Sequence, residues 1–193
     1  MRRFTTLVLA LLAATPAMAT GEIERLITDA DRERLANYET IREAALKEAR
    51  DGGERQDVAT LDAVLEPEPM AWSDFDMTGD WQCRTIKVGG QAELVVYGWF
   101  KCRVADDGSG WTLEKLTGSQ RTKGRFFTES DTRLTYLGSL AFNNDPFPAY
   151  GAGPDSDQAG YAFRSGEASW RIDFPGPRYE SRFDILEFRR RQN

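Results

Sequence analysis

Residues 79–90 read GDWQCRTIKVGG, and this stretch sets the fold class. Apolar and β-branched residues mixed with polar ones over Asp80–Val88 are typical of a strand. The following pair, Gly89-Gly90, is a strong turn signal because glycine adopts backbone angles that other residues avoid. We therefore predict a β-strand over Asp80–Val88 that leads into a turn.

Seven more short runs of this kind follow, separated by turn residues or, over Asn143–Gln158, by a long loop. They are Glu93–Val104, Trp111–Leu116, Arg125–Thr128, Arg133–Phe142, Gly160–Arg164, Ser169–Phe174 and Phe183–Phe188. Eight strands joined mostly by tight turns predict an up-and-down antiparallel β-barrel, which closes and so removes its free edges. A sandwich of two sheets is the alternative. The predicted barrel domain spans residues 72–193.

Residues 20–71 form a helical N-terminal segment and linker. Ile23, Leu26 and Leu35 belong to an apolar stripe at helical spacing, and a second short helical run covers Val58–Leu65. Thr28 or Asp29 would cap a second helix. We expect the stripe to pack against the barrel; the alternative is that it forms a surface for a protein partner.

The first nineteen residues have the parts of a secretory signal peptide. Arg2-Arg3 is a basic start, Phe4–Ala14 is apolar, and Ala17-Met18-Ala19 is a small-x-small cleavage motif. The apolar run is shorter than the ~20 residues needed to cross a membrane. We expect cleavage after Ala19 and an exported, periplasmic protein that does not span the membrane.

The two cysteines test the predicted register. If the first hairpin turned tightly over Gly89 to Ala92, Cys83 would face Gly98, and Cys102 would lie roughly 13 Å further along. That distance is too long for a disulfide. Because exported proteins form disulfides, we still predict a Cys83–Cys102 bond. It requires a wider connection, a bulge or a later start of the second strand.

Composition excludes several classes of function. The chain has 25 basic and 31 acidic residues, and removal of Arg2 and Arg3 would change its net charge from −6 to about −8. An acidic protein lacks the positive surface that binds nucleic acid. With no histidine, Ser-His-Asp and Cys-His catalysis and the usual zinc sites are excluded. We expect no cofactor, no metal and no catalytic residues.

The run Leu116–Arg121 supplies the first candidate binding residues. Ser119, Gln120 and Arg121 place several hydrogen-bond donors at one point, and Arg121 would hold a carboxylate through two bonds. The alternative is a structural turn in which Arg121 pairs with an acid such as Glu180.

Aromatic residues supply the other candidates. Four of them would line an apolar pocket inside the barrel: Tyr97, Trp99, Tyr136 and Trp170. Alternatively, the aromatic side chains simply fill the interior, as in many small barrels. Tyr97 and Trp99 share one face of a regular strand, whereas Phe100 and Cys102 share the other. Only one of these two faces would point inward.

Acidic residues give no recognisable catalytic or metal motif. Asp155-Ser156-Asp157 lies in the long loop, but its spacing does not match a calcium loop, so we expect a mobile acidic rim over one mouth of the barrel. Glu180 and Asp184 share a strand face, as paired catalytic carboxylates would. We expect both to be structural acids that balance arginines.

Two resemblances extend this interpretation. Gly79-Asp80-Trp81 resembles the Gly-x-Trp motif of lipocalin-like barrels, which implies that Trp81 plugs a closed end. A late arginine would pack over Trp81, and the candidates are Arg182, Arg189 and Arg190. Seven stretches resemble an uncharacterised family of exported bacterial proteins with a domain of unknown function. They are Thr28–Leu35, Cys83–Lys87, Tyr97–Arg103, Leu116–Arg121, Tyr136–Gly138, Trp170–Arg171 and Glu180–Asp184.

The family resemblance implies a single exported domain and no known activity. In architecture alone, the chain is also similar to small periplasmic barrel inhibitors of secreted metalloproteases. Two hypotheses follow. The first is a non-catalytic binding module for a small apolar or amphipathic ligand, and the second is an interaction or inhibitor module with an envelope protein partner.

Overall fold

The computed structural model describes residues 20–190, so the predicted signal peptide lies outside the described residues. Within this range there are four helices and nine strands. The helices are α1 (Thr20–Leu26), α2 (Asp29–Ala36), α3 (Tyr38–Gly52) and α4 (Arg55–Leu65). The strands are β1 (Gly79–Gly90), β2 (Leu94–Val96), β3 (Phe100–Asp106), β4 (Trp111–Lys115), β5 (Gln120–Thr128), β6 (Leu134–Phe142), β7 (Asp157–Arg164), β8 (Ser169–Pro175) and β9 (Ser181–Arg189).

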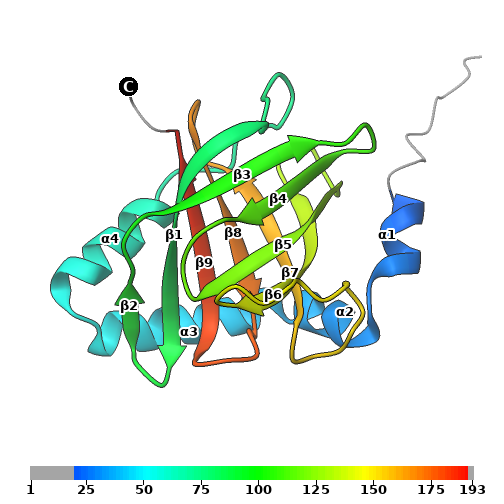
Figure 1. Cartoon of the computed structure of the whole chain (residues 1–193). Helices are drawn as coiled ribbons and strands as arrows, with labels where there is room; N and C mark the ends of the chain where they lie inside the picture. The colour runs from blue at the N-terminus through cyan, green and yellow to red at the C-terminus, as the bar shows by residue number, and fades with distance from the viewer. Residues whose placement is uncertain (1–19, 191–193) are drawn as a thin grey trace, which may run out of the picture.

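The strands form one antiparallel sheet that closes into a barrel, because β1 pairs with the last strand, β9 (Figure 1). From β3 to β9, each strand pairs with the next one in the sequence. β2 and β3 both pair with the edge of β1 that faces away from β9. They are therefore two parts of one interrupted wall strand. The predicted eight-stranded, lipocalin-like antiparallel barrel is confirmed, with one extra strand created by this interruption.

The interruption between β2 and β3 is a β-bulge. The first hairpin is one residue wider than a tight turn would be, since Val88 pairs with Leu94 rather than Glu93. Residues 97–99 then insert one further residue opposite β1. A bulge of this kind shifts the register of the strand that follows it. Both of these features differ from the tight hairpin that the sequence suggested.

The shifted register brings the cysteines together. Cys83 pairs with Phe100 instead of Gly98, and Cys102 pairs with Trp81. The two cysteines are thus diagonal neighbours on adjacent strands, with Cα atoms 5.9 Å apart, and they form a disulfide. The predicted bond is confirmed, and it depends on the wider connection and on the bulge.

β5 begins at Gln120, well before the predicted start at Arg125. The sequence predicts a turn at Lys123-Gly124, but the strand continues through both residues. Gly124 pairs with Gly138 of β6, and a Cβ at Gly124 would lie 2.7 Å from Cζ of Tyr136. This glycine therefore makes room for an aromatic ring inside the barrel and does not mark a turn.

The helical segment is divided at Thr28 and Asn37. Thr28 is the N-cap of α2, because its hydroxyl accepts a hydrogen bond from the backbone N–H of Asp31. This confirms one of the two predicted caps. The start of α2 is also tied to the long loop before β7, since the Tyr150 hydroxyl donates to Asp31 at 2.6 Å. Asn37 separates α2 from α3.

The helices pack against the outside of the barrel. α3 lies against β1 and β9, and α4 lies against β2 (Figure 1). The buried face of α3 consists of Ala45, Leu46 and Ala49, which pack with Ile86 of β1 and Ile185 of β9. Burial of this apolar face is what stabilises α3, because a helix of this length is marginal on its own.

One end of the barrel is filled with aromatic side chains. The linker after α4 inserts Trp72, Phe75 and Met77 into the interior. Trp170 of β8 is fully buried there and stacks on Phe188 of β9, with ring centroids 3.5 Å apart. Close packing of large side chains makes this end a solid core.

Arg190 closes the filled end. Its guanidinium lies over the ring of Trp81 at 3.9 Å and donates to the backbone carbonyl of Thr78 at 2.8 Å. Of the three arginines that the lipocalin-like resemblance suggested, Arg190 therefore takes the position over the tryptophan. Arg189 instead lies over the ring of Trp99 outside the barrel.

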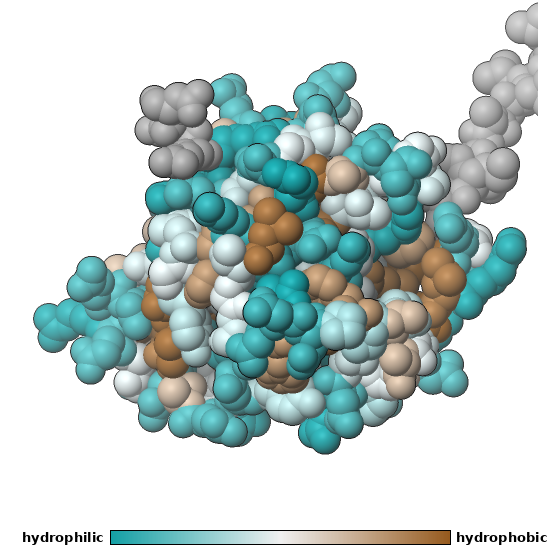
Figure 2. All heavy atoms as spheres, in the orientation of Figure 1, coloured by the Kyte–Doolittle hydropathy of each residue, from teal (hydrophilic) through white to brown (hydrophobic). Residues whose placement is uncertain are grey.

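Hydrophilic side chains cover most of the face shown in Figure 2. The large apolar side chains that remain exposed come from separate elements: Leu26, Met70, Tyr97, Leu116 and Phe142. No helix within residues 20–190 is long and apolar enough to cross a membrane.

Candidate functional site

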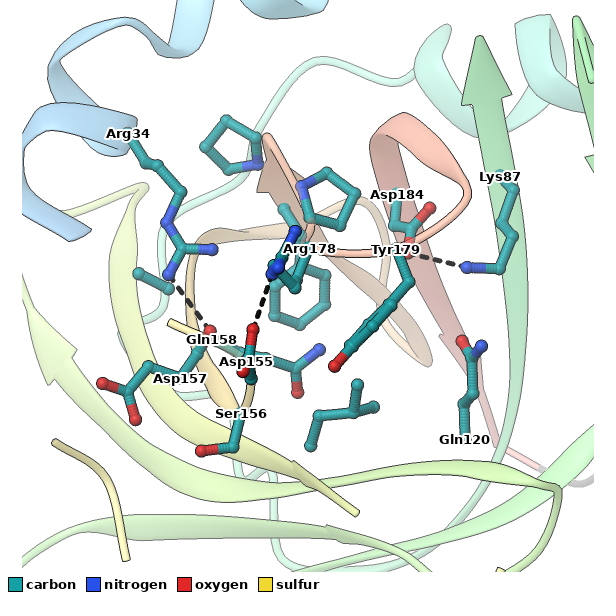
Figure 3. A pocket seen from close by; sticks show the side chains of 15 residues that line it. Arg34, Lys87, Gln120, Asp155, Ser156, Asp157, Gln158, Arg178, Tyr179 and Asp184 are labelled. Carbon is teal, nitrogen blue, oxygen red and sulfur yellow. Dashed lines mark hydrogen bonds and ion pairs between the residues drawn. The ribbon is translucent and has the colours of Figure 1, made fainter. Parts of the chain in front are cut away.

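The end of the barrel away from Trp81 is hollow. Three adjoining cavities open there, with volumes of about 30, 40 and 110 Å³. The residues that line at least two of them are Thr85, Lys87, Lys115, Gln120, Leu140, Gln158, Phe174 and Asp184. We name these three adjoining cavities together the lysine cavity, and Figure 3 shows the part around Lys87 and Asp184.

Strand alternation puts these polar groups inside the barrel. Thr85 and Lys87 follow Trp81 and Cys83 on the inner face of β1. Lys115 comes from the end of β4, and Asp184 comes from β9. The inner faces of the strands thus carry aromatic residues at the filled end and charged residues at the open end.

Lys87 is held by two carboxylates. Its Nζ lies 3.2 Å from Oε2 of Glu180 and 3.4 Å from Oδ2 of Asp184. Burial disfavours the charge on Lys87, but Asp184 and Glu180 outweigh burial, so its pKa rises above the ordinary value. Burial raises the pKa of Asp184, and Lys87 and Ser181 offset only part of that effect. Lys87 is therefore a fixed, protonated ammonium.

Lys115 is buried without such a partner. Among residues 20–190, no carboxylate forms an ion pair with its Nζ, whose one hydrogen bond goes to Oγ1 of Thr85 at 3.2 Å. The Nζ also lies 4.4 Å from the centre of the Phe100 ring. Burial, followed by repulsion from Lys87, lowers the pKa of Lys115 to about 8. Its remaining N–H groups have no acceptor among the residues that the structure describes.

Two amide side chains complete the polar lining. Gln120 borders all three cavities and donates to Glu180 at 3.3 Å. Oε1 of Gln158 is buried and has no hydrogen-bond partner among the described residues. A buried polar atom without a partner costs free energy, so the position suits a polar molecule or an ordered water.

The predicted binding residues divide between the two ends and the outside of the barrel. Tyr97, Ser119 and Gln120 line the largest part of the lysine cavity. Tyr136 and Trp170 are fully buried in the filled core, where the Tyr136 hydroxyl bonds Thr122 at 2.7 Å. The structure thus brings three of the seven predicted residues together in the largest part of the cavity.

Trp99 lies outside that cavity, and Arg121 borders its 40 Å³ part while its guanidinium is directed to the long loop. The bulge separates two residues that a regular strand would place on one face. Tyr97 donates its backbone N–H to the carbonyl of inward-facing Thr85, whereas Trp99 lies outside the barrel under Arg84. Arg121 donates to the backbone carbonyls of Asn143 and Asp145 in the long loop. Its partners are thus carbonyl groups rather than an acid such as Glu180.

The acids of the long loop have structural contacts. Asp155 pairs with Arg178 at 2.7 Å, and Asp157 accepts backbone hydrogen bonds from Gly151 and Gly153. Within the part of the chain that the structure describes, no group of three or more acidic or cysteine side chains could hold a metal ion. Asp157 thereby fixes the loop beside the mouth of the lysine cavity, and Arg34 of α2 donates to its carbonyl (Figure 3).

Sequence reasoning missed the two lysines that give the site its character. A signal was present, since Lys87 stands two positions after Thr85 and four after Cys83 on one strand face. In the same way, Lys115 stands two positions after Leu113. Lysines on amphipathic strands usually mark the solvated face, so the pattern becomes informative only once the inner face is known.

Fold and site together define a class of protein: a closed, lipocalin-like barrel with one filled end and a small lysine-lined cavity at the other. A family model described as Domain of unknown function (DUF4893) matches residues 24–188. The chain therefore belongs to this family, which confirms the resemblance to an uncharacterised domain family. No curated protein matches the chain, and no solved structure does either.

Proposed function

We propose that this protein is an exported, non-catalytic binding module whose barrel holds a small amphipathic molecule by an anionic head group. The observation that carries the proposal is Lys115, a buried ammonium with no carboxylate partner among residues 20–190, at the edge of a cavity of about 110 Å³. An uncompensated buried cation is costly, and a bound anion would compensate it.

The lining of the cavity supports an amphipathic rather than a purely ionic ligand. Lys115, Gln120 and Gln158 supply polar contacts, whereas Leu140 and Phe174 supply apolar ones. Even the largest of the three cavities, at about 110 Å³, is well below the ~300 Å³ at which pockets for drug-sized ligands begin. A carboxylate with a short carbon chain fits these limits, and a long lipid chain does not.

Export and the absence of catalysis rest on other observations. The leader-like residues 1–19 support export, and the Cys83–Cys102 disulfide is typical of proteins from oxidising compartments. The lack of histidine supports a binding role over hydrolysis or proton transfer near neutral pH.

The alternative, an interaction or inhibitor module, relied on an apolar stripe at Ile23, Leu26 and Leu35. Leu35 is buried against the barrel and Ile23 packs beside it, so Leu26 alone is strongly exposed. The stripe thus serves mainly for packing, and we rank the small-ligand function first.

Calorimetric titration with butyrate and its neutral analogue butyramide tests the proposal. We expect butyrate to bind more tightly, because only butyrate carries the charge that complements Lys115. Lys115→Met should weaken butyrate binding by about 10–100-fold, the effect of losing one charge-assisted hydrogen bond. Lys123→Met is the matched control, because Lys123 is exposed on the outer face and pairs with Glu114.

Two outcomes would contradict the proposal. One is equal binding of butyrate and butyramide, and the other is butyrate binding that Lys115→Met leaves unchanged. Native mass spectrometry of protein purified from cells adds a separate check. A reproducible extra mass that is lost on denaturation would identify the natural ligand directly.

A further inference from the structure

We propose that Lys115 captures its ligand as a reversible imine, and that the ligand is a small carbonyl compound with a carboxylate, such as an α-keto acid. This inference rests on the proposed function and names the chemical class of the ligand more closely. It follows from how Lys115 differs from every other lysine in the chain.

The chain has five lysines, and Lys115 alone combines burial with the lack of a carboxylate partner among residues 20–190. Lys87 is equally buried but is held by Glu180 and Asp184. The other three are not buried: Lys47, Lys101 and Lys123. A nucleophilic amine must be free of ion pairs and close to an open space, and Lys115 meets both conditions.

The surroundings of Lys115 also favour its neutral form. Burial and the charge of Lys87 hold its pKa at about 8, so at pH 7 about a tenth of Lys115 is an unprotonated amine. A lysine that is desolvated beside a second cation is a known route to an activated amine. The two cavities that Lys115 lines are also bordered by the titratable and charged residues Lys87, Tyr97, Arg121, Glu180 and Asp184.

The chemical step needs no further reactant. The lone pair of the Lys115 nitrogen attacks the carbonyl carbon, and a proton passes from nitrogen to the carbonyl oxygen to give a carbinolamine. The nitrogen then loses its second proton and forms the C=N bond, while the hydroxyl group takes up a proton and leaves as water. Amine and carbonyl thus give imine and water, with no change of oxidation state.

The other residues of the cavity have roles in this step. Lys87 has one N–H beyond those directed to Glu180 and Asp184, and with Gln120 it can hold the carboxylate of the ligand. Asp184 lines the same space, and its carboxylate can accept the proton that the nitrogen loses and pass it to the departing hydroxyl. The carbinolamine hydroxyl can donate to the unpartnered oxygen of Gln158.

Reductive trapping tests the inference. The folded protein is incubated with α-ketobutyrate and sodium cyanoborohydride, which converts an imine into a stable secondary amine, and labelled lysines are located by peptide mass mapping. At pH 7 we expect Lys115 to be labelled roughly 100-fold faster than an exposed lysine of ordinary pKa, because a larger fraction of Lys115 is neutral. This ratio should fall toward pH 10, where exposed lysines also become neutral.

Lys115→Arg should lose the selective adduct, because arginine keeps the positive charge but cannot form an imine. Lys123→Arg, outside the cavity, should leave the adduct unchanged. Butyrate binding by the wild-type protein without preferred labelling of Lys115 would overturn the imine and leave the anion site standing. Absence of both butyrate binding and labelling in the wild-type protein would overturn both proposals. Denatured protein, in which every lysine is exposed, should show no preference.

Discussion

The two ends of this barrel are built from the same strands and have opposite contents. On β1, Trp81 faces a filled aromatic core, and Lys87, on the same inner face, faces a polar cavity. On β8, Trp170 stands at the filled end and Phe174 borders the cavity. Strand alternation therefore fixes which residues point inward. The type of residue at each height in the barrel then decides whether the interior there is a packed core or a polar cavity.

The two ends should also differ in their effect on stability. Burial of stacked aromatic rings at the filled end stabilises the folded state. Burial of Lys115 at the open end opposes folding, because a charged group loses hydration without gaining a partner. Substitutions at the two ends can therefore test the comparison through the free energy of unfolding.

The largest effect is expected for Trp170→Ala at the filled end. Removal of this fully buried ring, which stacks on Phe188, should lower the free energy of unfolding by about 3–5 kcal/mol. Urea denaturation followed by circular dichroism measures it. Trp99→Ala outside the barrel is the control and should cost less than about 1 kcal/mol. Similar losses for both variants would show that the aromatic core is not the main source of stability.

The disulfide joins two wall strands between the ends and comes next. Cys83 and Cys102 are 19 positions apart, so replacing both with serine should cost about 3 kcal/mol through the larger freedom of the unfolded chain. Urea denaturation at a single pH compares the double variant with the wild-type protein. The wild-type protein is measured with its disulfide intact and again after reduction. A reduced wild-type protein as stable as the oxidised one would contradict this estimate.

Substitution of the two cavity lysines should change the free energy of unfolding in opposite directions. Lys87→Met leaves Asp184 and Glu180 without their cation and should lower the free energy of unfolding by about 1–3 kcal/mol. Lys115→Met removes an unpaired buried charge and should raise it by a similar amount at pH 7. Thermal unfolding of both variants gives the signs. Destabilisation by both would mean that Lys115 is compensated in the folded protein.

The pH dependence of stability adds a test of Lys115 alone. Its pKa falls from 10.5 in the unfolded chain to about 8 in the folded one, so between these values the unfolded state binds more protons. The stability of the wild-type protein should therefore rise from pH 8 to pH 10 relative to Lys115→Met. Parallel urea titrations across this range measure the difference, and a constant difference would argue against the lowered pKa.

The smallest effect is expected at the lid of the filled end. Arg190→Ala removes the guanidinium over Trp81 and its hydrogen bonds to Asp76 and Thr78, and should cost about 1 kcal/mol. Arg190→Lys should recover only part of this, because an ammonium cannot keep the planar stacking geometry. Full recovery by lysine would show that charge alone is needed there.

Much of the fold could be predicted from local signals. Turn residues divided the chain into the correct number of wall strands, and Gly79-Asp80-Trp81 pointed to the closed end with its late arginine. The bulge could not be predicted, because Tyr97-Gly98-Trp99 reads as ordinary strand and the extra residue appears only against β1. Because the bulge was not predicted, the predicted pairing of Cys83 with Gly98 was also wrong.

The candidate site was predicted only in part for the same reason. Tyr97, Ser119 and Gln120 do reach the cavity, but Trp99 lies outside it and the guanidinium of Arg121 is directed to the long loop once the bulge and the longer β5 are in place. A shift of one residue moves a side chain to the other face of the sheet, so errors in register become errors in the site. The residues next to Lys87 and Lys115 in the sequence do not by themselves indicate that these lysines are buried.

The pairing of β9 with β1 has a consequence for the order of folding. β9 provides one seam of the barrel, part of the surface on which α3 rests, Asp184 for the cavity and, just beyond it, Arg190 for the lid. These contacts join the last strand to residues about a hundred positions earlier, so closing the barrel depends on pairing across a long stretch of chain. The barrel seam, the helical cover and the cavity each need β9 in place before they are complete.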